Sequence, residues 1–153
     1  MTRRLILLVA GALAGALAGL RGVARGAWVS AGAEEVPLEG DGSFWHVRAT
    51  VNSRERATFL VDTGATLCVV SLEIARRLDL KPVQEVELRT ANGTVRAPLV
   101  RLRQLEVGDA VARDLDAVVH DAVAAPLDGV LGLNFLNRFQ YAVDPKRRVL
   151  RLR

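Results

Sequence analysis

Polar and apolar residues alternate over much of the chain beyond Glu34, which is the pattern of strands that are half buried against a core. One alternating run extends from about Phe44 to Val51, and the apolar runs ATFLVD and TLCVVS follow it as two further strands. From Leu72 to Leu80 the apolar residues recur every three or four positions, which predicts a short helix with Ser71 as its N-cap. This part of the chain is therefore predicted to form three short strands and one helix.

The strand pattern returns after Pro82 and continues to the C-terminus. Two alternating arms flank Asn92 and Gly93, and an Asn-Gly pair between such arms strongly favours a hairpin. A second turn is predicted at Gly108 and Asp109, a short helix in NFLNR, and a closing hairpin between YAVD and RVLRLR. Many short strands with one or two short helices predict a mostly β fold, built as a small closed barrel or a sandwich.

The first 33 residues differ in composition from the rest of the chain. Arg3 and Arg4 precede an uncharged run, Leu5–Leu20, of 16 residues. This length falls between that of the apolar part of an export signal, about 7–15 residues, and that of a membrane-spanning helix, about 17–25 residues. Residues 1–33 are therefore predicted to be a signal peptide or an N-terminal membrane anchor. In either case we expect residues 34–153 to be exported, either to the periplasm or anchored outside the cytoplasm through residues 5–20.

The charge distribution argues against a nucleic-acid-binding protein. The chain has 21 Lys and Arg against 17 Asp and Glu, but four of the arginines precede Glu34, which is the first acidic residue. The rest of the chain is thus close to neutral and its charges are interspersed, so it lacks the basic stripe typical of phosphate binding. We therefore expect no nucleic-acid partner.

Cysteine and histidine give no sign of a metal site. Cys68 is the only cysteine, which excludes an intramolecular disulfide, and its apolar surroundings predict a small core residue. His46 and His120 are far apart in sequence, and neither has a Cys or His neighbour at ligand spacing. We therefore expect no metal.

One carboxylate interrupts the apolar run TFLVDTGATLCVVS. Asp62 lies between two predicted strands and is followed by the turn-forming residues Thr63 and Gly64. A buried charge is costly unless it is paired, so stability alone does not explain a buried Asp here. An Asp that bonds the backbone of its own turn is the alternative, and D-T-G by itself is weak evidence of catalysis.

The D-T-G motif becomes much more specific when it is taken together with the stretches that follow it in order. The set is FLVDTGAT (Phe59–Thr66), TANGTV (Thr90–Val95), DGVLGLNFL (Asp128–Leu136) and VDPKRRVLRL (Val143–Leu152). On these residues the chain, from about Val36 to its end, resembles the retropepsin-like aspartic proteases. The resemblance is closer to bacterial members with an N-terminal membrane-targeting segment. It implies the retroviral-type aspartic protease fold in residues 34–153, with one lobe per chain.

The resemblance also implies a reaction. Aspartic proteases are the standard example of two carboxylates that share one proton around a water molecule, because like charges about 3 Å apart cannot both ionise. The chain has a single D-T-G, and the residues after the leader are too few for two such lobes. The implied protein is thus an aspartic-type endopeptidase that acts on a polypeptide as a homodimer, with one Asp62 from each subunit and no cofactor.

The same resemblance assigns roles in the loop that follows the second apolar run. Asp62 is the catalytic acid or base, depending on which subunit holds the proton. Thr63 hydrogen-bonds across the dimer, Gly64 permits the tight loop and leaves room for the substrate backbone, and Ala65 contributes a backbone contact.

Two further segments receive roles from the resemblance. Asn92 and Gly93 form the tip of a flap that closes over an extended peptide and excludes water. A second signature packs behind the catalytic loop as structural support, although each of its residues also suits an ordinary core strand that ends at a glycine: Val130, Leu131 and Gly132.

The chain departs from the viral members at two positions. Those proteins carry an Asp two residues after the D-T-G glycine and an Arg directly after the second-signature glycine, and the two form an ion pair. Here the positions hold Thr66 and Leu133, so both partners are absent together and no charge is left unpaired. Viral cleavage preferences therefore do not transfer. A module of the same fold that binds peptides or supports assembly without cleaving them is the alternative function, against which the intact D-T-G argues.

Overall fold

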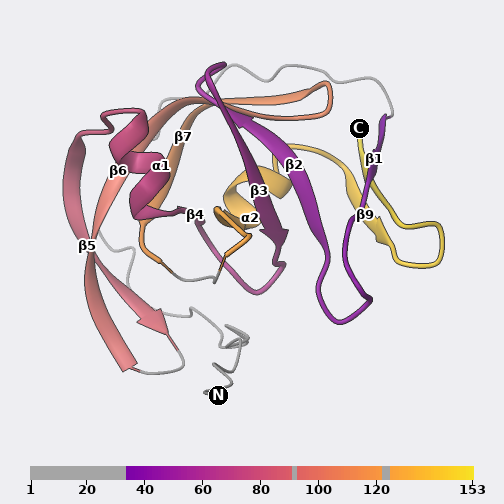
Figure 1. Cartoon of the computed structure of the whole chain (residues 1–153), viewed down its shortest axis with the longest axis horizontal. Coiled ribbons are helices and arrows are strands. Elements are labelled where there is room, and N and C mark those ends of the chain that lie inside the picture. The colour runs from indigo at the N-terminus through magenta and orange to yellow at the C-terminus, as the bar shows by residue number, and fades with distance from the viewer. Residues whose placement is uncertain (1–33, 91–92, 122–124) are drawn as a thin grey trace.

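The computed structural model describes residues 34–90, 93–121 and 125–153, which form ten strands and two short helices (Figure 1). The strands are β1 (Glu34–Pro37), β2 (His46–Val51), β3 (Glu55–Val61), β4 (Cys68–Val70), β5 (Pro82–Thr90), β6 (Gly93–Val107), β7 (Ala110–Val119), β8 (Gly129–Leu131), β9 (Tyr141–Asp144) and β10 (Val149–Leu152). The helices are α1 (Leu72–Arg77) and α2 (Leu133–Leu136). The predicted leader, residues 1–33, lies outside the described residues.

Six strands close into a barrel, in the order β2-β3-β8-β4-β7-β6, and a pairing of β2 with β6 completes the circle. The pairs β3–β8 and β4–β7 are parallel and the other pairs are antiparallel, so the barrel is mixed. Strand β5 pairs only with β6 among the described strands and extends from the barrel as one arm of a long hairpin. The prediction of a small closed, mostly β fold with two short helices is confirmed.

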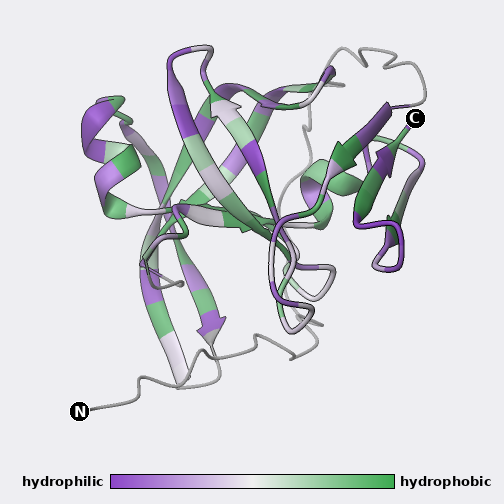
Figure 2. Cartoon of the chain, turned by 45° about the vertical axis from the view of Figure 1, so that its right-hand side comes forward, coloured by the Kyte–Doolittle hydropathy of each residue, from purple (hydrophilic) through white to green (hydrophobic). Residues whose placement is uncertain are grey.

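The barrel interior is filled mainly by aliphatic side chains. Along β2, Val47, Ala49 and Val51 are at most 5% exposed, whereas Arg48 between them points to solvent. Figure 2 shows the same alternation of apolar and polar residues along the barrel strands. Because a slip of one residue would turn every apolar side chain outward, this alternation fixes the register of the strands.

A second, three-stranded sheet has the order β1-β10-β9 and joins the first described residues to the end of the chain. The closing hairpin of β9 and β10 was predicted, but β1 was not. It has only four residues, one of them a proline, and its partner β10 lies more than a hundred residues away in sequence. The alternation of side chains within so short a segment is too brief to predict a strand.

Several predicted boundaries were wrong, and those of the first helix and the first long strand have clear causes. The first helix ends at Arg77 and not at Leu80, because Leu78 is its C-cap and Asp79 adopts a left-handed conformation (φ 49°) that cannot continue the helix. Its N-cap is Ser71 as predicted, with Oγ accepting a hydrogen bond from the Ile74 N–H. The first long strand begins at His46 and not at Phe44, because residues 39–45 form a tight loop. No helix within the described ranges is long and apolar enough to span a membrane.

Candidate active site

The D-T-G segment lies in the loop that joins β3 to β4. These two strands are not neighbours, because β8 lies between them, parallel to β3 and antiparallel to β4. Val61 at the end of β3 is paired with Leu131 at the end of β8. The loop of residues 62–67 therefore passes the end of β8, where the second signature continues into α2, and the topology brings the two signatures together.

Asp62 is held at the base of this loop and is half-exposed. Its N–H donates to the Leu131 carbonyl oxygen at 3.2 Å, and its carboxylate Oδ1 accepts the Gly64 N–H at 2.8 Å. Its own carbonyl accepts the Ala65 N–H at 3.3 Å. The carboxylate contact alone is that of an ordinary Asx turn. What distinguishes this turn is that Leu131, in the second signature, also holds it through the hydrogen bond from the Asp62 N–H.

Helix α2 forms hydrogen bonds to the second half of the loop. The Leu133 N–H donates to the Ala65 carbonyl at 2.8 Å, and the Asn134 N–H donates to the Thr66 carbonyl at 3.0 Å. These donors belong to the first turn of a helix, where N–H groups have no partner within the helix. The loop carbonyls satisfy them, so helix and loop fix each other.

Asn134 adds two side-chain hydrogen bonds that sequence reasoning missed. Its Oδ1 accepts the Cys68 N–H at 2.8 Å, and its Nδ2 donates to the Asp116 carbonyl at 2.7 Å. The side chain thus links the residue that follows loop 62–67 to β7. The only signal in the sequence was a polar residue at the start of a short apolar helix, directly after the second signature.

Gly132 allows the close approach of these two segments. A Cβ at this position would lie 2.5 Å from the Leu67 carbonyl oxygen and 2.9 Å from that of Ala65. The position therefore excludes any side chain unless the loop moves. Next to it, Val130 packs in a small apolar cluster with Ala65 and Val69.

Cys68 lies behind the loop and is fully buried. Burial raises the pKa of its thiol to about 12, and the Gly132 N–H, which donates to Sγ at 3.3 Å, opposes this only in part. A thiol that stays protonated is a poor nucleophile. Cys68 therefore belongs to the packing of the site.

The predicted flap is the hairpin of β5 and β6. Gly93 begins β6 with a φ of 119° and is paired with Thr90, whereas Asn92 lies outside the described residues. Farther down, four hairpin residues share one apolar cluster with Leu67 of loop 62–67 and Val118 of β7: Val86, Leu88, Ala97 and Leu99. The base of the hairpin thus packs in the same apolar cluster as the last residue of the loop.

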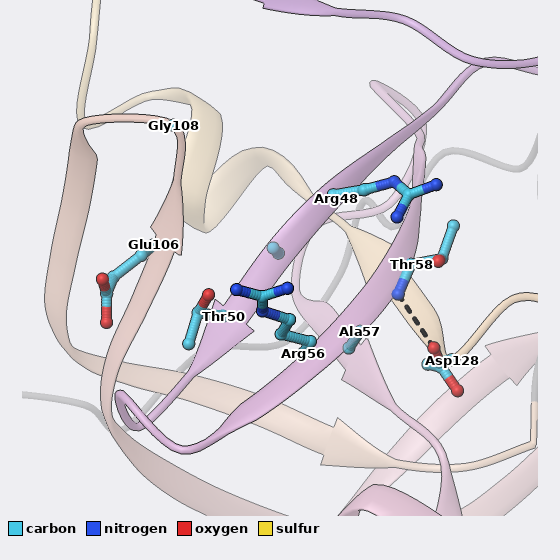
Figure 3. Close-up of a pocket in the computed structure, with 9 residues that line it drawn as sticks. Arg48, Thr50, Arg56, Ala57, Thr58, Glu106, Gly108 and Asp128 are labelled. Carbon is cyan, nitrogen blue, oxygen red and sulfur yellow. Dashed lines mark hydrogen bonds between the residues drawn. The ribbon is translucent and has the colours of Figure 1, made fainter.

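A pocket of about 360 Å³ lies elsewhere, on the outer face of β2 and β3 (Figure 3). Arg48 and Arg56 project from these strands, and Glu106 and Asp128 border them. The Asp128 carboxylate accepts the Thr58 N–H at 2.8 Å and so extends the pairing of β3 with β8. None of the residues that line the pocket belongs to loop 62–67, so this pocket is not the candidate active site.

Thr63 and Gly64 are exposed, and Thr66 and Leu133 are partly exposed. The structure therefore brings together Asp62 to Ala65, the second signature and the base of the hairpin. No charged pair occupies the positions of Thr66 and Leu133.

Comparisons with known proteins agree with this arrangement. The family described as gag-polyprotein putative aspartyl protease matches residues 47–138. The crystal structure of a retropepsin-like aspartic protease from Rickettsia conorii superposes with a TM-score of 0.59 and 25% identity, over 79% of this chain and 89% of that one. An uncharacterized protein in the cobV 5′ region of Sinorhizobium sp. is 33% identical over 117 residues, which cover 72% of this chain. The match spans about half, 48%, of that relative. The chain belongs to the retropepsin-like family of aspartic proteases, the family of the gag-polyprotein aspartyl proteases.

Proposed function

We propose that this protein is an aspartic endopeptidase whose active site forms in a homodimer, with one Asp62 from each subunit. The observation that carries the proposal is the setting of Asp62. Its carboxylate is half-exposed and held by the Gly64 N–H, in a loop that α2 anchors from behind. A surface turn with no function would not need this second layer of support.

The dimer follows from the chemistry. The described residues form one barrel with one D-T-G loop, and the reaction needs two carboxylates that share a proton. A two-fold axis beside the loop supplies the second carboxylate from an identical chain. Thr63, which is exposed next to Asp62, would then lie where it can hydrogen-bond to the other subunit.

In the proposed reaction a water molecule lies between the two carboxylates. The ionised carboxylate takes a proton from the water molecule while the water oxygen attacks the peptide carbonyl carbon. The protonated carboxylate donates its proton to the carbonyl oxygen. The tetrahedral intermediate collapses when the carboxylate that took the water proton passes it to the amide nitrogen and the C–N bond breaks. The other carboxylate then recovers its proton from a hydroxyl of the intermediate, and the amine leaves. The substrate would be an extended polypeptide that lies between the catalytic loops and the hairpin tips near Gly93.

The test compares the wild-type chain with Asp62→Asn, on a denatured protein and on a peptide library. Asn keeps the shape of the side chain and can still accept the Gly64 N–H, so the fold is expected to persist in circular dichroism and thermal melts. Cleavage is expected to fall to background. An Asn variant that cleaves as fast as the wild type would refute the role of Asp62. A folded, dimeric wild type that cleaves nothing would favour the peptide-binding alternative.

A further inference from the structure

The turn between β9 and β10 carries two adjacent arginines that reach different parts of the molecule. Arg147 forms a two-pronged ion pair with the Glu35 carboxylate of β1, at 2.6 and 2.8 Å. Arg148 reaches the loop of residues 39–45, between β1 and β2. Its Nη2 donates to the Gly40 carbonyl at 2.7 Å, and its guanidinium lies 5.4 Å from the centre of the Trp45 ring.

The 39–45 loop has a well-defined conformation. Paired hydrogen bonds of 2.9 Å between Glu39 and His46 close it. The Asp41 Oδ1 accepts the Ser43 N–H at 2.9 Å, and this backbone bond, aided by that of Phe44, holds the pKa of Asp41 below its ordinary value. Gly40 has a φ of 138°, and a Cβ there would overlap with the Phe44 carbonyl oxygen.

This loop ends beside the candidate catalytic residue. The ladder between β2 and β3 ends at His46 and Leu60, and the Val61 N–H continues it with a 2.8 Å hydrogen bond to the Trp45 carbonyl. The next residues beyond this hydrogen bond are Phe44 on the β2 side and Asp62 on the β3 side. The segment that Arg148 holds is therefore the neighbour of the D-T-G loop on the side away from β8.

We propose that Arg148 is a positioning residue of the active site: by holding Trp45 and the Gly40 carbonyl, it keeps Phe44 in place as a wall of the substrate cleft beside Asp62. The proposal rests on the proposed protease function. An arginine suits the task because its planar guanidinium can lie over an aromatic ring and donate to a carbonyl at the same time, which the lysine ammonium does less well. Asp62 keeps its own bonds to Leu131 and Gly64, so Arg148 is expected to affect substrate binding more than the chemical step.

The experiment uses the full chain with Trp28→Phe, which leaves Trp45 as the single tryptophan. Three variants are compared in this background: Arg148→Met, Arg148→Lys and the control Arg147→Met. The measurements are the fluorescence of Trp45, its quenching by acrylamide, and kcat and KM. The kinetic constants are measured at protein concentrations where specific activity no longer depends on dilution. Arg148→Met is expected to shift Trp45 emission to the red, increase quenching and raise KM about fivefold with little change in kcat. This factor corresponds to about 1 kcal/mol, which is typical of a cation–π contact at an exposed site.

Arg148→Lys is expected to have a KM between those of the wild type and Arg148→Met. Arg147→Met removes only the ion pair with Glu35 and is expected to leave the Trp45 fluorescence and KM unchanged. Unaltered Trp45 fluorescence in Arg148→Met, or an altered spectrum with an unaltered KM, would overturn the inference. An equal rise in KM for Arg147→Met would also overturn it, because the whole turn and not Arg148 would then be responsible. If the wild type itself proves inactive, the protease proposal fails, and the fluorescence comparison still tests whether Arg148 holds the loop.

Discussion

Replacing Gly132 with alanine should damage the active site more than the fold. The added Cβ would lie 2.5 Å from the Leu67 carbonyl oxygen, and an ordinary contact begins at 3.4 Å. The atoms in the way are backbone atoms of the catalytic loop, which no rotamer change can remove. The loop must therefore move by about 0.9 Å relative to β8 and α2.

The expected size of the effect follows from that displacement. A misplacement of about 1 Å in a catalytic group can lower activity about 10²-fold. Overpacking of this kind typically destabilises a protein by about 1–3 kcal/mol, which for a domain of this size lowers Tm by roughly 4–12 °C. The variant should therefore remain folded at 25 °C but have about one-hundredth of the wild-type kcat/KM.

The matched control is Gly129→Ala at the other end of β8. A Cβ there would overlap with the Val69 carbonyl oxygen and lie 2.8 Å from the Phe59 ring, so the steric clash is similar but involves β3 and β4 and not the loop of residues 62–67. Both variants are assayed for cleavage per folded molecule, with the folded fraction taken from thermal melts. Gly129→Ala is expected to lower Tm and keep most of its activity. Equal losses of activity in the two variants, or full activity in Gly132→Ala, would refute the argument that Gly132 sets the position of the loop.

Further outcomes test the dimer, the proton, the thiol and the leader. The cleavage rate should fall more steeply than linearly on dilution, and full specific activity in a strictly monomeric sample would contradict a shared site. The rate should be highest at acidic pH, because the proposed reaction needs one proton shared between two carboxylates, and a rate that keeps rising into alkaline solution would point to another mechanism. Cys68 should resist thiol reagents at pH 8 until the protein unfolds, and rapid labelling of the native protein would show that the thiol is accessible. Because burial raises the pKa of this thiol from 9.0 to about 12, the free energy of unfolding should also fall as pH rises above about 9. Cell fractionation and mass spectrometry of the mature N-terminus should place residues 34–153 outside the cytoplasm, and an intact chain found in the cytoplasm would contradict export.

The elements that sequence reasoning predicted are those whose cause is local. The helix after Ser71, the turn at Gly108 and the hairpin that closes the chain each depend on residues within a few positions of one another. The closing of the barrel by β2 and β6 depends on residues more than fifty positions apart, and no local pattern encodes it. For the same reason β1 was missed, since its partner is at the far end of the chain.

The candidate site divides in the same way. The motif around Asp62 and the second signature ending at Gly132 could be predicted to lie together because the family resemblance supplies the topology. Asn134 could not, because its two side-chain partners are backbone groups 66 and 18 positions away. Arg148 was likewise missed, because its contacts with Gly40 and Trp45 depend on the pairing of β1 with β10. Backbone acceptors and donors carry no residue signature, so such roles become visible only in the folded chain.

The loop of residues 62–67 lacks the ion pair of the viral members, and this has a consequence for its pH range. Where viral members use an ion pair, this chain has Thr66 and Leu133, and the loop is held instead by amide hydrogen bonds from Leu133 and Asn134 and by the close contact at Gly132. A carboxylate–guanidinium pair loses its attraction when acid protonates the carboxylate, whereas amide hydrogen bonds do not titrate in this range. The amide hydrogen bonds that hold the loop should therefore stay intact at the acidic pH that the proposed reaction favours. A loss of activity on acidification should then not come from collapse of the loop that holds Asp62.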